Sequence, residues 1–156
     1  MEQTLVIVKP DALQRRLVGR IIQRFEQKGL RIVAMKMIRL SAELAERHYG
    51  VHKGKPFYEP LLAFITSAPV VVMVLEAPDA VATVRRLMGP TFGAEAPAGT
   101  LRGDFAVSNR YNLVHGSDSP RTSRKEIDLF FRPEEILDYR LDDARWVSEL
   151  IPTEPS

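Results

Sequence analysis

The order of strand-like and helix-like segments along this chain predicts an α/β fold of the α+β kind. Four short segments, rich in apolar and β-branched residues, have the length and composition of strands, at residues 4–8, 30–40, 70–75 and 102–107. Helical patterns separate them, so that two β-α-β units follow one another along the chain. This order predicts a ferredoxin-like split βαβ sandwich, in which a four-stranded antiparallel sheet has helices packed over one face.

The first unit starts with a buried strand and ends with a second strand at residues 30–40. Residues 4–8 (TLVIV) are mostly apolar, and Lys9-Pro10 ends the strand. Asp11 is a candidate N-cap for the helix that follows, and Gly29 is a candidate C-terminal stop. This helix is supported by apolar residues at helical spacing, which are Val18, Ile21, Ile22 and Phe25.

The middle of the chain predicts three helices around its most apolar strand. Ser41 is suited to cap a short helix over residues 43–49, and residues 57–66 also have a helical pattern. The run VVVMVL at 70–75 is the clearest strand in the protein. A further helix is expected over 78–89, because proline stands at its start and glycine at its end.

The last third of the chain predicts a long loop, the fourth strand and one more helix. Residues 90–100 are rich in Pro, Gly and Ala, which favours a loop, and the strand at 102–107 follows them. A second loop leads into a helix over residues 120–131. Residues 133–156 predict a polar tail with one or two helical turns, anchored by Trp146.

Length and composition predict a single domain over residues 1–156, with about 133–156 as a C-terminal extension. No apolar run approaches the roughly 20 residues of a membrane helix, and no secretion signal precedes the first strand. Cysteine is absent, which excludes disulfides and thiolate chemistry. We therefore expect a cytoplasmic protein. A net charge of +2 without a basic stripe favours a local anion site over a nucleic-acid surface.

The stretch 112–120 (NLVHGSDSP) concentrates groups that can carry chemistry. It places the imidazole of His115 beside Gly116, and two hydroxyls, a carboxylate and a helix-opening proline follow. A histidine so placed can be accessible and close to helix-terminal N–H groups, as a phosphate-handling nucleophile requires. The alternative is a capped loop with an incidental histidine, in which Gly116 makes the turn and Ser119-Pro120 starts the helix. The residues alone leave both interpretations open.

Four further side chains could bind phosphate groups. They are Lys9 after the first strand, Arg85 on a predicted helix, Thr91 in the long loop, and Arg102 at the start of the predicted fourth strand. Guanidinium groups match phosphate oxygens in shape and neutralise their charge. Each of these side chains could equally be a solvated surface group. The glycine motifs of P-loop, dinucleotide-binding and protein-kinase sites are absent, so side chains would have to hold the phosphate.

A carboxylate and two aromatic rings complete the candidate site. Glu126, on the last predicted helix, could orient the imidazole of His115 and select its tautomer, or it could be an exposed residue with basic neighbours. Tyr49 and Phe57 bracket a short loop, where an aromatic ring could stack on a nucleotide base or belong to the core.

Three motifs together resemble one known family. They are Lys9-Pro10-Asp11, Arg102-Gly103-Asp104-Phe105 and Asn112-x-x-His115-Gly116-Ser117-Asp118-Ser119. Their combination resembles the nucleoside diphosphate kinases, and the match runs in register from about residue 3 to residue 140. The third motif is highly specific, unlike a lone histidine, so the resemblance favours the nucleophile interpretation of His115.

The resemblance implies a phosphotransferase that moves the γ-phosphate of a nucleoside triphosphate to a nucleoside diphosphate and so maintains nucleoside triphosphate pools. In this ping-pong reaction His115 would be phosphorylated at Nδ1 and would then pass the phosphoryl group to the acceptor. Mg²⁺ would be carried by the nucleotide phosphates without a direct protein ligand, and Asp118 would contact it at most through water.

The resemblance also implies a role for each site residue. The catalytic residues would be His115, Lys9, Glu126 and Ser117, the last two as groups that orient the imidazole. The nucleotide-binding residues would be Lys9, Tyr49, Phe57, Leu61, Arg85, Thr91, Arg102 and Asn112. Of these, the two arginines and the threonine would hold phosphates with the tyrosine nearby, the lysine and the asparagine would bind the sugar, and the phenylalanine and leucine would contact the base.

The implied partners are ATP and other nucleoside di- and triphosphates, together with further copies of this chain. The tail favours a hexamer over a tetramer. Three departures from the common family pattern, Phe92-Gly93, Arg110-Tyr111 and Ala98, affect nucleotide affinity and assembly rather than the matched catalytic residues. Two alternative functions are a catalytically silent nucleotide-binding scaffold or regulator and a single-stranded nucleic-acid binder.

Overall fold

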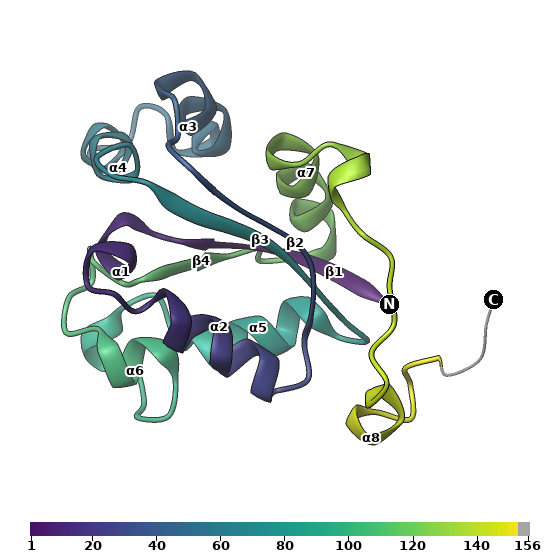
Figure 1. Ribbon diagram of the computed structural model, residues 1–156. Helices are drawn as coiled ribbons and strands as arrows, with labels where there is room; N and C mark the ends of the chain where they lie inside the picture. Colours follow the sequence, from purple (N-terminus) through teal and green to yellow (C-terminus); the bar gives the residue numbers. More distant parts are fainter. Residues whose placement is uncertain (153–156) are drawn as a thin grey trace.

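The computed structural model describes residues 1–152 and confirms the predicted four-stranded antiparallel sheet (Figure 1). Its strands are β1 (Glu2–Val8), β2 (Arg31–Ile38), β3 (Val70–Ala77) and β4 (Val114–Gly116). They lie in the order β2-β3-β1-β4, and every neighbouring pair is antiparallel. The two central strands each open one β-α-β unit, as the split βαβ arrangement requires.

Helices cover both faces of this sheet, so the prediction of one covered face is wrong (Figure 1). One face carries α1 (Pro10–Gln14), α2 (Val18–Gln27), α5 (Ala80–Met88) and α6 (Leu101–Phe105). The other carries α3 (Ala42–His48), α4 (Tyr58–Ile65) and α7 (Pro120–Phe130). The reason lies in the strands, because β3 is buried along its whole length and successive side chains point to opposite faces.

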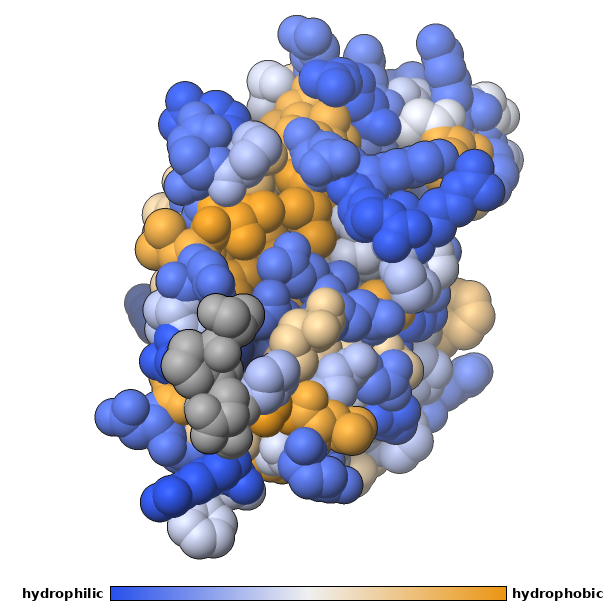
Figure 2. Space-filling model, turned by 90° about the vertical axis from the view of Figure 1, so that its right-hand side faces the viewer, coloured by the Kyte–Doolittle hydropathy of each residue, from blue (hydrophilic) through white to orange (hydrophobic). Residues whose placement is uncertain are grey.

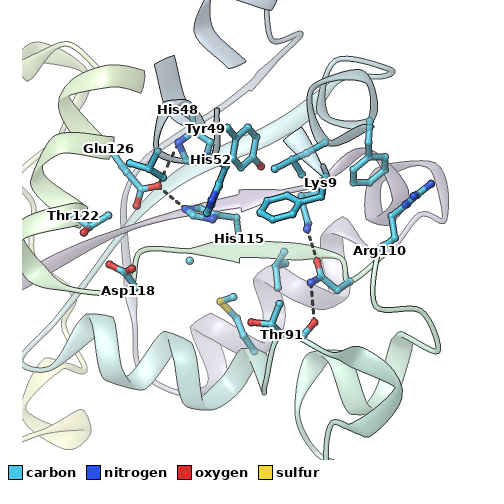
Figure 3. A pocket seen from close by; sticks show the side chains of 18 of the residues that line it. Lys9, His48, Tyr49, His52, Thr91, Arg110, His115, Asp118, Thr122 and Glu126 are labelled. Atoms are coloured by element: carbon cyan, nitrogen blue, oxygen red, sulfur yellow. Dashed lines mark hydrogen bonds and ion pairs between the residues drawn. The ribbon is translucent and has the colours of Figure 1, made fainter. Parts of the chain in front are cut away.

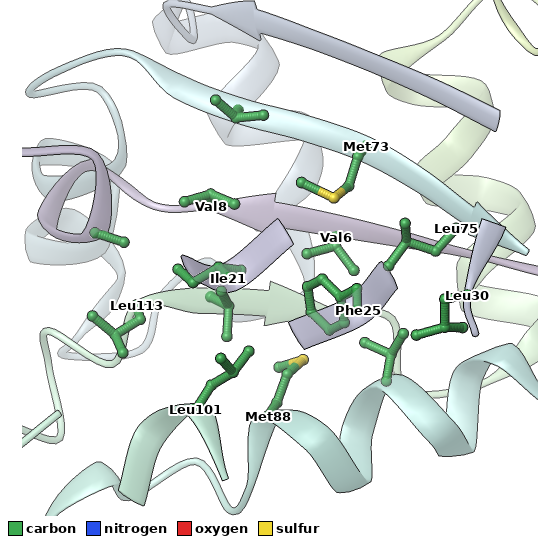
Figure 4. Packing of buried hydrophobic residues seen from close by; sticks show 14 of the residues in the cluster. Val6, Val8, Ile21, Phe25, Leu30, Met73, Leu75, Met88, Leu101 and Leu113 are labelled. Atoms are coloured by element: carbon green, nitrogen blue, oxygen red, sulfur yellow. The ribbon is translucent and has the colours of Figure 1, made fainter. Parts of the chain in front are cut away.

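The two hydrophobic clusters divide β1 between them. Val6 and Val8 pack with Phe25 of α2 on one face (Figure 4), whereas Leu5 and Ile7 pack with the helices of the other face. Apolar side chains that leave water on both faces stabilise the sheet as a central layer. The clusters thereby fix the ends of β1 and β4, from which the site residues project.

The fourth strand is not where the sequence predicted it. Residues 102–107 fall mainly in helix α6, whose N-cap Thr100 accepts a hydrogen bond from the N–H of Gly103 at 3.0 Å. The ladder position beside β1 is taken by the three residues of β4, with His115 opposite Ile7. The histidine therefore lies in a strand rather than in a loop. An apolar pair four residues apart, Leu101 and Phe105, suits a helix as well as a strand.

Helix boundaries agree with the sequence at several positions and differ at one. Ser41 caps α3, Ser119 caps α7, and Gly29 follows α2 with a φ of 93°. Asp11 is not an N-cap, because α1 begins at Pro10. Its Oδ2 instead accepts a hydrogen bond from the N–H of Leu113 at 3.1 Å, which joins α1 to the segment before β4.

The C-terminal segment runs beside β2. The N–H of Leu137 donates to the carbonyl of Val33 at 2.8 Å, after which the short helix α8 (Ala144–Val147) follows. Trp146 does not anchor the tail, because it is 77% exposed. Three single 3-10 turns complete the described elements, η1 (Gly50–His52), η2 (Gly93–Glu95) and η3 (Pro133–Glu135). The last residues of the expected extension, 153–156, lie outside the described residues. Within residues 1–152 no helix has the length and apolar character to cross a membrane.

Candidate functional site

A cavity of about 1310 Å³ opens beside His115 (Figure 3). It is lined by the α3–α4 region, the end of α5 and the segment after it, the segment before β4, β4 itself and one face of α7. The predicted site residues that line it are Lys9, Tyr49, Phe57, Leu61, Arg85, Thr91, Arg102, Asn112, His115, Asp118 and Glu126. Ser117 is the exception, because it is fully buried behind the wall. The fold thus gathers side chains that are more than 100 positions apart in sequence, such as Lys9 and Asn112.

The strand β4 turns His115 toward this cavity. Its neighbours Val114 and Gly116 face α5, and alternation along the strand directs the imidazole to the opposite side. Gly116 is needed for close packing rather than for a turn, because a Cβ there would lie 2.6 Å from the sulfur of Met88. The absence of a side chain at Gly116 lets β4 approach α5. This close approach sets the position of His115 in the cavity wall.

Glu126 of α7 holds one nitrogen of the His115 ring. The Nε2 atom lies 2.6 Å from Oε2 of Glu126, and a carboxylate can only accept, so Nε2–H is the donor. Burial alone would raise the pKa of Glu126, but the hydrogen bond and charge of His115, helped by Ser117 and His48, hold that pKa below its usual range. The ionised carboxylate therefore leaves the lone pair of the imidazole on Nδ1. The side chain of His115 is 26% exposed, so this nitrogen can be reached.

Ser117 sits beneath this pair. Its Oγ accepts a hydrogen bond from the N–H of Leu5 at 3.3 Å, which ties the end of β4 to β1. Its hydroxyl also contributes to the low pKa of Glu126. The serine therefore bears on the imidazole through the carboxylate.

Lys9, Asn112 and Thr91 form a chain of hydrogen bonds along one wall (Figure 3). The Nζ of Lys9 donates to Oδ1 of Asn112, whose Nδ2 donates to the carbonyl of Thr91 at 2.9 Å. Burial lowers the pKa of Lys9 to about 8; Asp11 opposes this effect and Arg102 adds to it. The ammonium group is thus charged at neutral pH. An anion bound beside it would stabilise this charged form further.

Arg102 organises the backbone around the site. Its buried guanidinium donates to three carbonyls, those of Gly89 at 2.9 Å, Asn112 at 3.1 Å and Val114 at 2.7 Å. Burial, and then the charge of Arg85, lower its pKa to about 10, so it stays protonated. Three of its five N–H groups are used in this way, which leaves two that could meet a phosphate. Within residues 1–152 the side chain of Arg85 makes one hydrogen bond, which it donates to the carbonyl of Gly116 at 3.5 Å.

The outer part of the cavity is aromatic. Phe57 is 49% exposed at its rim with Leu61 nearby, whereas Tyr49 is buried, and burial followed by the charge of Glu126 raises the pKa of its phenol. Two positions that depart from the family pattern also line this part, Phe92 and Arg110. An exposed ring of this kind can offer its face to a planar group.

His48 is the site residue that sequence reasoning missed. Its side chain is only 2% exposed, its Nδ1 lies 3.3 Å from Oε2 of Glu126, and its ring centroid lies 4.8 Å from that of His115. Burial, reinforced by His115 and opposed by Glu126, lowers its pKa to about 3, so the ring is neutral. No spacing in the sequence links residue 48 to residue 115, because α3 and β4 meet only in the folded chain.

Comparison with known proteins decides the family. The family model described as nucleoside diphosphate kinase matches residues 2–136. The chain belongs to the nucleoside diphosphate kinase family. The predicted family is confirmed, and with it the function of a phosphotransferase that acts between nucleoside tri- and diphosphates.

Relatives of this family match nearly the whole chain. The nucleoside diphosphate kinase of Pelotomaculum thermopropionicum is 52% identical over 149 residues, which are 96% of this chain and 100% of the relative. That of Staphylothermus marinus is 52% identical over 138 residues, 88% of this chain and 98% of the relative. A solved structure from Halobacterium salinarum, in complex with CDP, matches with a TM-score of 0.93 at 47% identity, covering 95% of this chain and 99% of that one.

Proposed function

We propose that His115 is the residue that carries the phosphoryl group of the kinase reaction. The observation that supports this most directly is the ring geometry, in which Glu126 accepts the Nε2 proton and Nδ1 keeps its lone pair. Among the described residues, no hydrogen bond engages Nδ1. An accessible nucleophilic nitrogen beside several cations is what phosphoryl transfer needs.

The proposed reaction has two half-steps at one site. In the first, Nδ1 of His115 attacks the γ-phosphorus, the N–P bond forms, and the bond to the β,γ-bridging oxygen breaks, so that the nucleoside diphosphate leaves. In the second, a terminal phosphate oxygen of another nucleoside diphosphate attacks the phosphohistidine and restores the imidazole. Glu126 stabilises the positive charge that the ring gains during attack, because its carboxylate is ionised and 2.6 Å away.

The cationic wall would position the nucleotide for this attack. Arg85 and Arg102 would bind the phosphates together with Thr91 and the nearby Tyr49. Lys9 and Asn112, already joined by a hydrogen bond, would bind the sugar, and Lys9 would also meet the transferring phosphate. Positive charge around the equatorial oxygens lowers the barrier of phosphoryl transfer.

The rim would hold the base mainly by stacking. Phe57 is exposed there and Leu61 lies beside it. A ring that stacks on the π-face discriminates little among bases, because every base offers such a face. This arrangement supports the acceptance of ATP and of other nucleoside di- and triphosphates.

Mg²⁺ would enter with the nucleotide. A magnesium ion at such sites typically keeps several waters and uses substrate phosphates with one or two carboxylates. Asp118 lines the cavity next to the His115 wall and fits this demand as a water-mediated contact. The ion would neutralise phosphate charge, while the residues of the chain supply position and the nucleophile.

We further propose that the chain forms one domain over residues 1–156, with a C-terminal extension from about residue 133, and that it is located in the cytoplasm. We also propose that it assembles as a homo-oligomer, a hexamer in preference to a tetramer. Strand β2 is an edge of the sheet and exposes Met35 and Met37. Figure 2 shows a hydrophobic area on the side of the molecule that carries the C-terminal segment. Exposed apolar edges of this kind favour association, which light scattering on the purified protein would measure.

The phosphohistidine can be tested directly. Incubation with γ-labelled ATP and Mg²⁺ is expected to leave label on the protein that is acid-labile and base-stable, and added diphosphate should remove it as triphosphate. An N–P bond has this stability pattern, whereas a serine phosphate is stable in acid. Failure of folded protein to take up label, or label that diphosphate does not remove, would contradict the ping-pong proposal.

The pKa of Lys9 predicts a basic limb in the pH profile. Because the charged ammonium is the form that binds phosphate, kcat/KM is expected to fall about tenfold per pH unit above a pKa of about 8. Lys9→Arg keeps a charge at high pH, so its profile should lose this limb whatever its absolute rate. An unchanged limb in that variant would assign the titration to another group.

A further inference from the structure

A cluster of two imidazoles and one carboxylate lies at the inner end of the cavity. His48, His115 and Glu126 each direct one ligand atom into it, and these atoms lie within 4.8 Å of one another (Figure 3). Within residues 1–152 no other group of histidine and acidic side chains is so arranged. The three residues come from α3, β4 and α7, which pack against the same face of the sheet or belong to it.

The buried His48 has no partner in this cluster that satisfies it. Neither of its ring nitrogens makes a hydrogen bond of acceptable geometry, although Nδ1 lies 3.3 Å from Oε2 of Glu126. Its remaining surroundings are the rings of Tyr49, His115 and Phe130. Buried polar atoms are almost always paired, so an unpaired imidazole directed at a carboxylate and a second imidazole calls for an explanation.

We propose that this cluster binds a zinc-like transition-metal dication, and that the bound ion blocks the nucleophile. Two histidines and one glutamate are a known ligand set for Zn²⁺ sites that keep a fourth position open. Nitrogen ligands select against Mg²⁺ and Ca²⁺, which prefer oxygen. The cavity at His115 supplies the open fourth position, for water or a phosphate oxygen.

Two of the three distances within the cluster have to change for a tetrahedral ion. Ligand atoms about 2.0–2.1 Å from a tetrahedral Zn²⁺ lie about 3.3 Å apart. The 3.3 Å between His48 and Glu126 already meets this value, whereas the 2.6 Å between His115 and Glu126 has to widen. The remaining pair, His48 with His115, sets the 4.8 Å spread of the cluster and has to close. Both changes involve His115, which is the most exposed of the three side chains, so its ring is the one that can shift, away from Glu126 and toward His48.

Metal binding changes which nitrogen of His115 carries the proton. The ion takes the lone pair of Nε2, so the proton that Nε2 now donates to Glu126 moves to Nδ1, with no net proton released. His48 is already neutral and binds through Nδ1 with its proton on Nε2. A protonated Nδ1 has no lone pair for attack on phosphorus, which makes the site inhibitory. This inhibition depends on the proposed role of His115, whereas metal binding does not.

The test measures Zn²⁺ binding to the full-length, nucleotide-free protein by competition with a chromophoric chelator. We expect one Zn²⁺ per chain, and at least about tenfold weaker binding in His48→Phe and in Glu126→Gln. His48→Phe keeps an aromatic ring against Phe130 and removes ring nitrogens that make no hydrogen bond. His52→Gln is the matched control, because His52 also lines the cavity but lies outside the cluster, and it should bind as the unmodified chain does.

A spectroscopic readout separates a built site from loose association. Co²⁺ in place of Zn²⁺ should give the intense visible absorption of a four-coordinate ion, and His48→Phe should lose it. Unchanged Zn²⁺ affinity in a folded His48→Phe would overturn the proposal, as would absence of one-to-one binding in the unmodified chain. Zn²⁺ should also slow phosphohistidine formation, and a chelator that prefers Zn²⁺ to Mg²⁺ should reverse this inhibition. If labelling with Mg²⁺ fails in the absence of Zn²⁺ while Zn²⁺ still binds, the role of His115 is wrong and the metal site stands.

Discussion

His115→Ala is expected to lower the rate of γ-phosphate transfer by at least about four orders of magnitude. The variant removes the proposed nucleophile, and removal of a nucleophile that forms a covalent intermediate has effects of this size or larger. Steady-state transfer from ATP to a second nucleoside diphosphate, measured with a coupled assay, provides the rate. No other accessible imidazole replaces it, because His48 is buried and His52 lies near Phe57 at the rim.

The same variant should still bind nucleotide. Lys9, Arg85 and Arg102 remain, so the dissociation constant for a nucleoside diphosphate is expected to change by less than about threefold, corresponding to well under 1 kcal/mol. Calorimetric titration measures this constant, and circular dichroism confirms the fold. Binding lost together with transfer would mean that the histidine supports the cavity rather than the chemistry. Transfer retained at more than about one per cent would exclude it as the nucleophile.

Arg102→Lys is expected to destabilise the fold by about 3 kcal/mol and to slow transfer by about a hundredfold. A lysine keeps the charge, but it cannot reach the carbonyls of Gly89, Asn112 and Val114 together, so at least two buried charge-assisted hydrogen bonds are lost. Asn112 and Val114 stand on either side of the bend that leads to His115. A shift of about 1 Å in a catalytic group can cost a hundredfold in rate.

Arg85→Lys is the matched control for this result. Arg85 also lines the cavity, yet among the described residues its side chain donates one long hydrogen bond, to the carbonyl of Gly116 at 3.5 Å. The same substitution should therefore change the free energy of unfolding by less than about 0.5 kcal/mol. Urea denaturation of both variants measures the difference. Equal stability of the two lysine variants would show that the three carbonyl contacts contribute little to the fold.

The local pattern of the chain predicts most elements but misplaces the strand that carries His115. Residues 70–75 could hardly be anything other than a strand, and Ser41, Ser119 and Gly29 mark helix ends by their own backbone chemistry. Residues 102–107 are different, because their apolar spacing suits strand and helix alike. The three residues of β4 are too short a run to signal a strand, and only pairing with β1 defines them.

The candidate site shows the same division. The motif around His115 specifies the residue types and, by its specificity, the family. It does not show that Glu126 takes the Nε2 proton, that Arg102 binds backbone carbonyls, or that His48 lies against Glu126. Leu113 gives a further example. Its φ of 76° is unusual for a branched residue, and Lys9 and Asp11 hold it through backbone and side-chain hydrogen bonds.

By itself, then, the sequence determined the family and predicted the residues of the candidate site, because the motifs consist of contiguous residues. The tertiary structure alone decided which face of the sheet the imidazole occupies, which of its nitrogens is free, and which distant groups set its charge. These properties depend on contacts that form only in the folded chain, such as His115 with Ile7 in the sheet and Glu126 with both His115 and His48. Such contacts exist only after both faces of the sheet have been covered and packed.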